Sequence, residues 1–175
     1  MKLIKKKKII NTAHKVDLFS VAFSSGLFVG YAPIASGTIG SLFALIFLLI
    51  PCFSEYYILL PAIIIAFPLS IVTSEKMTKR YGDDPSVVVI DEIIGMWITI
   101  LVVKIFIYDG SNLFYLPLVL SFLLFRFFDI VKLYPANYFD KLKSGFGIVM
   151  DDIISGIQAG ILTSILLYFY NNFFR

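Results

Sequence analysis

Two similar segments of this 175-residue chain each place a pair of adjacent carboxylates at the start of an apolar stretch: Asp91 and Glu92, then Asp151 and Asp152. A single acid at a helix N-terminus needs no explanation beyond the helix dipole, which is worth a few tenths of a kcal/mol. Four acids in apolar flanks are costly and indicate function. Because hard cations such as Mg²⁺ prefer carboxylate oxygens and share their shell with phosphate, the four acids predict a metal site, with helix capping as the alternative.

A second group of charges, Arg126, Asp129 and Lys132, has the spacing i, i+3, i+6 and so follows one face of a helix. Arginine can grip a phosphate through two parallel hydrogen bonds, and lysine adds a point charge. Asp129 would then either join the metal or hold Arg126 in place. The alternative is an internal ion-pair ladder in which Lys132 extends to the membrane surface, and both interpretations can hold together.

A loop of small residues, 35–41, enters the first apolar stretch. Backbone N–H groups and hydroxyls at a helix N-terminus can bind an anion, which makes Gly37, Thr38 and Ser41 candidate substrate-binding residues. A tightly packed helix cap is an equal alternative, and the Gly-Lys-Ser/Thr element of a P-loop is absent. The sequence also lacks a Cys-x5-Arg loop and an Asp-x-Asp motif, and its one histidine, His14, lies in a polar segment. Removal of a phosphate would therefore depend on carboxylates and a metal.

The composition indicates the elements that must position these residues. The chain is 59% hydrophobic and 15% charged, with a mean hydropathy of +0.89, so its charged residues are too few to cover a soluble protein of this size. Several apolar stretches approach the roughly 20 residues that cross a bilayer. We predict one all-α membrane domain over residues 1–175 with about five apolar helices. They are expected at residues 42–53 (extended backwards through 37–41), 56–72 (kinked at Pro61 and Pro68), 87–107, 113–133 and 149–170.

The remaining apolar segment, residues 18–34, is interrupted by Ser, Gly and Pro, and we expect it to be interfacial or re-entrant. The basic segment 1–17 is then cytoplasmic, and 13 of the 15 basic residues fall on that side, as the positive-inside rule requires. These are Lys2, Lys5, Lys6, Lys7, Lys8, Lys15, Lys76, Lys79, Arg80, Arg126, Lys132, Lys141 and Lys143. A lysine cluster beside membrane segments indicates contact with anionic lipid in preference to nucleic acid.

The same topology gathers acids at the cytoplasmic face. They are Asp83, Asp84, Asp91, Glu92, Asp129, Asp140, Asp151 and Asp152. Polar residues of four segments thus converge on one side of the membrane, as an active site requires.

Four motifs in this order resemble the phosphatidylglycerophosphatase A family. They are ASGTIGSL (35–42), DEIIGMWIT (91–99), FRFFDIVK (125–132) and GIVMDDIISG (147–156). The resemblance covers roughly residues 26–160. The family usually has Pro where Ser36 stands, Pro-Trp-Pro after Lys132 and a Gly-Gly pair before the last motif, but none of these departures removes a charged group.

The resemblance implies a Mg²⁺-dependent phosphatase of the bacterial inner membrane that converts phosphatidylglycerophosphate to phosphatidylglycerol in phospholipid biosynthesis. Asp91, Glu92, Asp151 and Asp152 would hold the metal directly or through water. Arg126 and Lys132 would bind the phosphate oxygens, and Asp129 would be a further ligand or the base that orients water; an aspartate nucleophile is left open.

Two other classes remain open. A divalent-cation transporter would also gather carboxylates in the membrane, but near its midplane and not at one face. A phosphatidyltransferase of the CDP-alcohol type would share the compartment and the acids, yet its Asp-x2-Asp-Gly-x2-Ala-Arg motif is absent.

Overall fold

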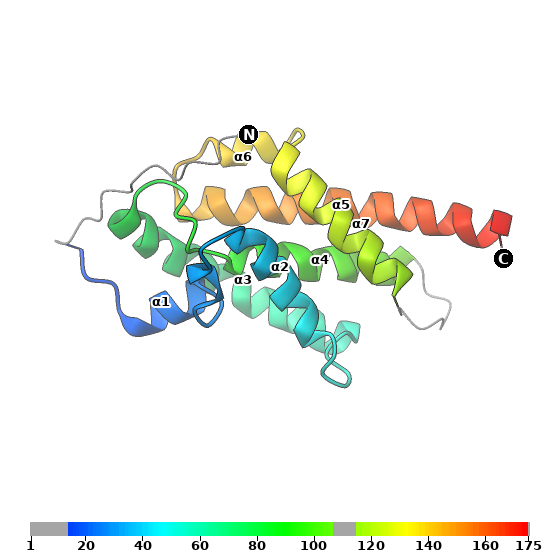
Figure 1. Cartoon of the computed structure of the whole chain (residues 1–175), viewed down its shortest axis with the longest axis horizontal. Coiled ribbons are helices and arrows are strands. Elements are labelled where there is room, and N and C mark those ends of the chain that lie inside the picture. Colours follow the sequence, from blue (N-terminus) through cyan, green and yellow to red (C-terminus); the bar gives the residue numbers. More distant parts are fainter. Residues whose placement is uncertain (1–13, 107–114, 175) are drawn as a thin grey trace.

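The computed structural model describes residues 14–106 and 115–174, and within these ranges every regular element is helical. The elements in chain order are α1 (Leu18–Ser24), the 3-10 turn η1 (Val29–Tyr31), α2 (Ser36–Phe47), α3 (Tyr56–Tyr81), α4 (Ile90–Phe106), α5 (Leu116–Val131), α6 (Ala136–Asp140) and α7 (Gly145–Phe174). The all-α prediction is confirmed for the described residues. The longest helix, α7, runs along most of the long axis of the molecule (Figure 1).

Helix α4 is the central element of the bundle. Most of its residues are buried, from Ile90 to Val103, and it packs against α2, α3, α5 and most extensively α7. The Trp97 indole Nε1 donates to the Ala44 carbonyl oxygen of α2 at 3.2 Å, and Phe47 stacks edge-on against the same ring. Burial on all sides fixes the orientation of α4, and with it the acids in its first turn.

The N-terminal apolar segment is not a continuous helix. It forms the seven-residue α1 and the three-residue η1, separated by the positive-φ residues Gly26, Leu27 and Phe28. At 1.5 Å per residue α1 reaches only about 11 Å, far less than a bilayer core. This short, broken structure agrees with an interfacial or re-entrant segment.

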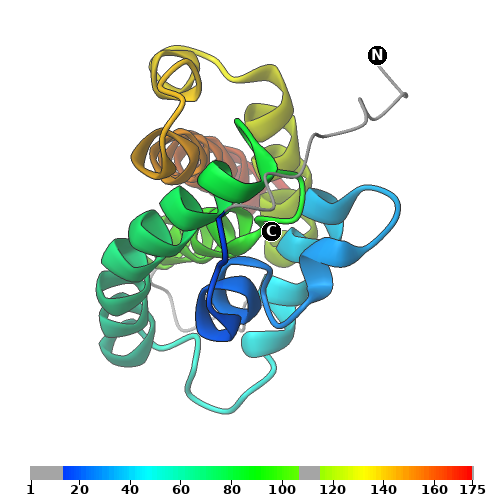
Figure 2. The ribbon, with the colours of Figure 1, turned by 90° about the vertical axis from the view of Figure 1, so that its left-hand side faces the viewer.

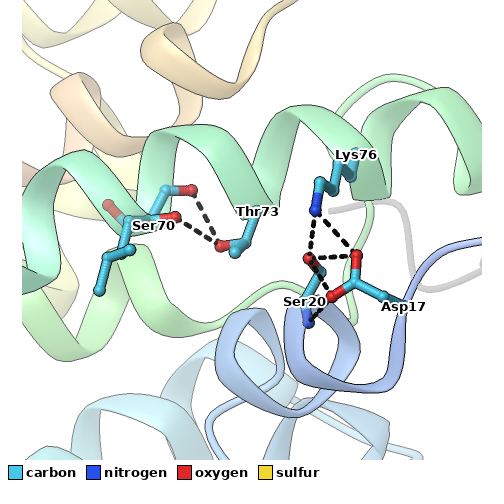
Figure 3. A network of polar contacts seen from close by, with 6 residues as sticks. Asp17, Ser20, Ser70, Thr73 and Lys76 are labelled. Atoms are coloured by element: carbon cyan, nitrogen blue, oxygen red, sulfur yellow. Dashed lines mark hydrogen bonds and ion pairs between the residues drawn. The ribbon is translucent and has the colours of Figure 1, made fainter.

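Polar contacts tie this segment to α3 (Figure 3). Asp17 caps α1 by accepting a hydrogen bond from the Ser20 amide, and the Lys76 ammonium donates to Asp17 Oδ1 at 2.8 Å and to Ser20 Oγ at 3.1 Å. The hydrogen bond from Lys76, supported by those from Ser20, holds the pKa of the Asp17 carboxyl well below its usual value. The start of the described chain is therefore fastened beside the C-terminal half of α3.

Helix α3 corrects one sequence expectation. It was expected to end near residue 72, before a polar segment, but it continues to Tyr81 with Pro61 and Pro68 inside it. Thr73 Oγ1 donates to the Leu69 carbonyl oxygen at 2.8 Å and lies 3.3 Å from that of Ser70, so the Thr73 hydroxyl, which Figure 3 labels, is satisfied within the helix. Lys79 and Arg80 in the last turn complement the helix dipole. Helix α2 was expected to run to residue 53 and instead ends at Phe47.

Two described helices, α3 and α7, are long and apolar enough to cross a membrane, fewer than the about five predicted. Helices α4 and α5 have 17 and 16 residues, so they reach about 26 and 24 Å, short of a hydrocarbon core of about 30 Å. Helix α2 has 12 residues. The bundle nevertheless exposes many large apolar side chains, such as Leu49, Ile64 and Ile130.

Candidate active site

A cavity of about 420 Å³ opens where the N-terminal parts of α4 and α7 meet the end of α5 and the short helix α6. Its lining is strongly acidic. The lining residues are Asp83, Asp84, Asp91, Glu92, Asp129, Lys132, Asp140, Leu142, Lys143, Ile148, Asp151 and Asp152. All eight acids that the sequence predicted to gather are among them, which confirms their convergence. Figure 2 views the molecule from this end.

Three of the acids lie close enough to bind one cation. Asp91, Glu92 and Asp152 each offer a carboxylate oxygen, and these oxygens lie within 4.8 Å of one another. Asp91 is 7% and Asp152 3% exposed, so these carboxyl groups are held together with little water. Asp91 Oδ1 and Glu92 Oε2 are buried and have no hydrogen-bond partner among the described residues. Buried carboxylate oxygens without a partner are costly, and a cation removes that cost.

The donor set fits a hard divalent cation. Mg²⁺ holds oxygen ligands at about 2.1 Å, so opposite ligands lie about 4.2 Å apart. Oxygens within 4.8 Å of one another reach that spacing by small side-chain movements. The cavity beside them leaves room for the waters and the phosphate that usually complete such a shell.

Asp151 is separated from this group. Its carboxylate accepts a hydrogen bond from the Lys132 ammonium, which also donates to Asp140 of α6. Asp151 is 3% exposed, and its Oδ1 additionally accepts from the Asp152 amide at 3.1 Å. Neighbouring residues on a helix point about 100° apart, and this difference places Asp152 with the α4 acids and Asp151 with Lys132.

Arg126 and Asp129 form an ion pair on α5. Arg126 Nη1 lies 2.7 Å from Asp129 Oδ2, and the two side chains are only 16% and 12% exposed. Nη1 also donates to the Ser41 hydroxyl of α2 at 3.2 Å, while the buried Nε has no hydrogen-bond partner in the described structure. Asp129 and Lys132 line the cavity, and Arg126 lies behind Asp129.

The small-residue loop lies behind the acids. None of Gly37, Thr38 and Ser41 belongs to the cavity lining. Gly37 and Ser41 instead contact side chains that approach the cavity: a Cβ on Gly37 would lie 2.2 Å from Glu92 Oε1, and Ser41 binds Arg126. The loop expected to bind substrate thus contacts Glu92 and Arg126 and does not line the cavity itself.

Sequence reasoning gave no role to Asp140, Asp83 and Lys143, which lie at the cavity rim. Asp140 binds Lys132, and Lys143 pairs with Asp83 at 2.9 Å with both side chains exposed. A signal was present, because Asp83 and Asp140 belong to the acids that the topology brings to one side. Their contacts depend on α6, a helix of five residues that no periodicity could reveal.

Comparison with known proteins identifies the family of the chain. The family model described as Phosphatidylglycerophosphatase A matches residues 22–167. The chain is 32% identical to the Phosphatidylglycerophosphatase A of Haemophilus influenzae over 94% of each chain. It is also 32% identical to the Phosphatidylglycerophosphatase A of Escherichia coli, over 89% of this chain and 86% of that one.

A third relative has a different name. It is a protein of Bacteroides thetaiotaomicron provisionally named a phosphatidylinositol-3-phosphatase, which is 33% identical over 83% of this chain and 91% of its own. No solved structure is significantly similar to this chain. Because the family model covers most of the sequence and two relatives that carry the family name align along nearly its whole length, the chain belongs to the phosphatidylglycerophosphatase A family.

Proposed function

We propose that the protein removes the terminal phosphate of phosphatidylglycerophosphate, giving phosphatidylglycerol and phosphate, in a reaction that requires Mg²⁺. Family membership supports the substrate. The observation that carries the proposal is the buried group of Asp91, Glu92 and Asp152, two of whose oxygens have no partner among the described residues. This group shares one cavity with Lys132. Carboxylates that can bind a metal ion therefore lie beside an ammonium group that can bind a phosphate.

The roles follow from position. Asp91, Glu92 and Asp152 would hold the metal, which when bound supplies positive charge to the phosphate and makes the attacking water more acidic. Lys132 presents its ammonium to the cavity and binds a non-bridging oxygen. Arg126, which pairs with the lining residue Asp129, would add positive charge next to the cavity and stabilise the charge that develops on the phosphoryl oxygens.

Two further acids assist. Asp129 holds the Arg126 guanidinium at 2.7 Å, and since it also lines the cavity, we assign it to accept the proton of the attacking water. Asp151 fixes Lys132. This assignment gives Asp151 an orienting role in place of the metal-binding role expected from its sequence.

We further propose a multi-pass protein of the bacterial inner membrane whose cavity faces the cytoplasm. Helix α3 carries Lys79 and Arg80 in its last turn, and Lys132 and Lys143 line the cavity. Lys104 instead lies in the last turn of α4, away from its acids. Cations concentrated at the cavity end favour that end as cytoplasmic. Helices α2, α4 and α5 would cross with the help of local bilayer thinning or flanking residues, because each is short for a span.

The position of the acids favours an enzyme over a transporter. Asp91 and Glu92 occupy the first turn of α4, and Asp152 is the eighth residue of α7. The group therefore lies toward one end of the bundle and not at its middle, where a transport site is expected.

The test is phosphate release by detergent-purified protein from phosphatidylglycerophosphate, with Mg²⁺ and with a chelator. We expect the wild-type protein to release phosphate only in the presence of Mg²⁺, and the Asp152→Asn variant to release none. The Bacteroides relative favours a second candidate, phosphatidylinositol 3-phosphate, so both lipids are supplied separately. Faster phosphate release from the inositol lipid than from phosphatidylglycerophosphate would identify the inositol lipid as the substrate. Absence of phosphate release from both lipids would overturn the proposal.

A further inference from the structure

Two residues near the start of α2 contact side chains of the site: Gly37 contacts Glu92, and Ser41 contacts Arg126. We propose that Gly37 and Ser41 are positioning residues, which hold the Glu92 carboxylate and the Arg126 guanidinium in place and do not bind substrate themselves. The catalytic part of this inference rests on the proposed function. It reassigns a loop whose small residues and helix N-terminus would otherwise indicate an anion site.

Gly37 makes room for Glu92. A Cβ at position 37 would lie 2.2 Å from Glu92 Oε1 and 3.4 Å from Arg126 Nη1. The first distance is shorter than any real contact, so any side chain at position 37 would displace the carboxylate. Gly37 is helical in α2 and has no positive φ that would require glycine. A glycine in a helix lowers stability relative to alanine, and close packing against Glu92 explains its presence.

Ser41 binds Arg126 in a way that leaves no proton for a phosphate. Its hydroxyl donates to the Gly37 carbonyl oxygen at 2.9 Å and accepts from Arg126 Nη1 at 3.2 Å. A hydroxyl has one proton, and the oxygens of a phosphate dianion accept hydrogen bonds and do not donate them. Since Ser41 is also fully buried, its hydroxyl acts on Arg126 and not on a substrate.

The two contacts join elements that are distant in sequence. Arg126 Nη1 is shared between Ser41 of α2 and Asp129 of its own helix, so two acceptors restrict the guanidinium. Glu92 belongs to the metal-binding group and packs on the same turn of α2. Residues that orient a metal ligand typically alter metal affinity by 10- to 100-fold when they are changed.

The first experiment measures Mg²⁺ binding without substrate, as the rise in melting temperature of the full-length protein in detergent during a Mg²⁺ titration. For Gly37→Ala we expect the Mg²⁺ concentration at half-maximal rise to increase about tenfold or more. Ile39→Ala, an exposed position in the same turn, is the control and should titrate as wild type. A Gly37→Ala protein with the wild-type titration would overturn the assignment of Gly37.

If Gly37→Ala does not yield folded protein, it is combined with Glu92→Asp, which shortens the displaced side chain. We expect the combined variant to fold and to be more stable than Gly37→Ala, because the shorter carboxylate relieves the close contact. Failure of Glu92→Asp to improve folding would show that position 37 does not act through Glu92, and would overturn the proposal. This arm needs no substrate, so it remains informative even if the proposed activity is absent.

The second experiment tests Ser41 with a double-mutant cycle on phosphate release. Ser41→Ala should lower kcat about tenfold with little change in KM or in Mg²⁺ titration. In the Arg126→Lys background, which lacks the Nη1 contact, Ser41→Ala should have almost no further effect, because it acts through Arg126. Multiplying effects would instead indicate a contact of Ser41 with substrate and overturn its assignment. Absence of activity in the wild type would contradict the proposed function and leave the Gly37 arm to decide.

Discussion

Gly95 of α4 and Gly156 of α7 lie in direct backbone contact: a Cβ on Gly156 would be 2.3 Å from the Gly95 carbonyl oxygen. Thr99 Oγ1 lies 3.0 Å from the Gly95 carbonyl oxygen and 3.1 Å from that of Gly156, which fixes the crossing. Each glycine follows one acid pair by about a turn. The contact therefore sets the separation between the carboxylates of α4 and Asp152.

Gly156→Ala should destabilise the bundle and move the acid pairs apart. The new methyl group would meet backbone atoms of Gly95, which cannot move without separating the helices, and overpacking of this kind costs about 1–3 kcal/mol. We expect a lower melting temperature and a weaker response to Mg²⁺. Ile157→Ala, one residue along on the outer face of α7, is the control and should retain both. A normal Mg²⁺ response in Gly156→Ala would show that the crossing does not set the spacing of the acids.

The sequence predicted the convergence of the acids for a physical reason. Charges in apolar helices are rare, so Asp91 and Asp152 stand out against their surroundings. The all-helical class follows from the same apolar stretches. The start of α2 at Ser36 was also anticipated, because the small residues 37–41 were expected to extend it backwards.

What sequence could not give depends on the packing between elements. Asp151 and Asp152 are adjacent and identical in type, and only the arrangement of α5, α6 and α7 assigns one to Lys132 and the other to Glu92. The extension of α3 to Tyr81 was missed because hydropathy marked its last turns as a loop. Its buried residues Ser74 and Met77 pack within the bundle and keep the polar part helical.

The two adjacent aspartates should differ in their effect on metal binding. Asp152→Asn removes a charge from the metal-binding group and should abolish the rise in melting temperature with Mg²⁺. Asp151→Asn weakens the contact with Lys132 and should preserve the Mg²⁺ response while lowering kcat. The measurements are a Mg²⁺ titration of the melting temperature and phosphate release for both variants. Equal loss of the Mg²⁺ response in both would place Asp151 in the metal site as well.

The proposed orientation can be tested by labelling, with the native cysteine in the unaltered protein as the reference for the opposite side. Cys52 is exposed and lies near Glu55, which pairs with Lys104 at the end of the bundle opposite the cavity. Cysteines placed at Lys79 or Lys141 in a Cys52→Ser background should be labelled only from the cytoplasmic side of oriented vesicles. Native Cys52 should be labelled only from the other side. Labelling of Cys52 and position 79 from the same side would contradict the topology.

The last prediction separates a phosphate-binding arginine from a structural ion pair. Arg126→Lys preserves the charge and can still pair with Asp129, but it loses the planar fork, a change that is not conservative where phosphate is bound. If Arg126 stabilises the transition state, kcat should fall by about a hundredfold, or about 3 kcal/mol, as when one oxyanion donor is removed. The melting temperature should change little.

The ion-pair interpretation gives the opposite result and can be tested on the same protein. Arg126 and Asp129 are nearly buried and 2.7 Å apart, so Arg126→Leu leaves an unpaired carboxylate and should destabilise the fold by about 3–5 kcal/mol. Adding Asp129→Leu should then restore much of the melting temperature. If activity returned together with stability in the double variant, Arg126 and Asp129 would both be structural. We expect stability to return without activity, because the double variant lacks both the guanidinium that we assign to the phosphate and the Asp129 carboxylate that we assign to the attacking water.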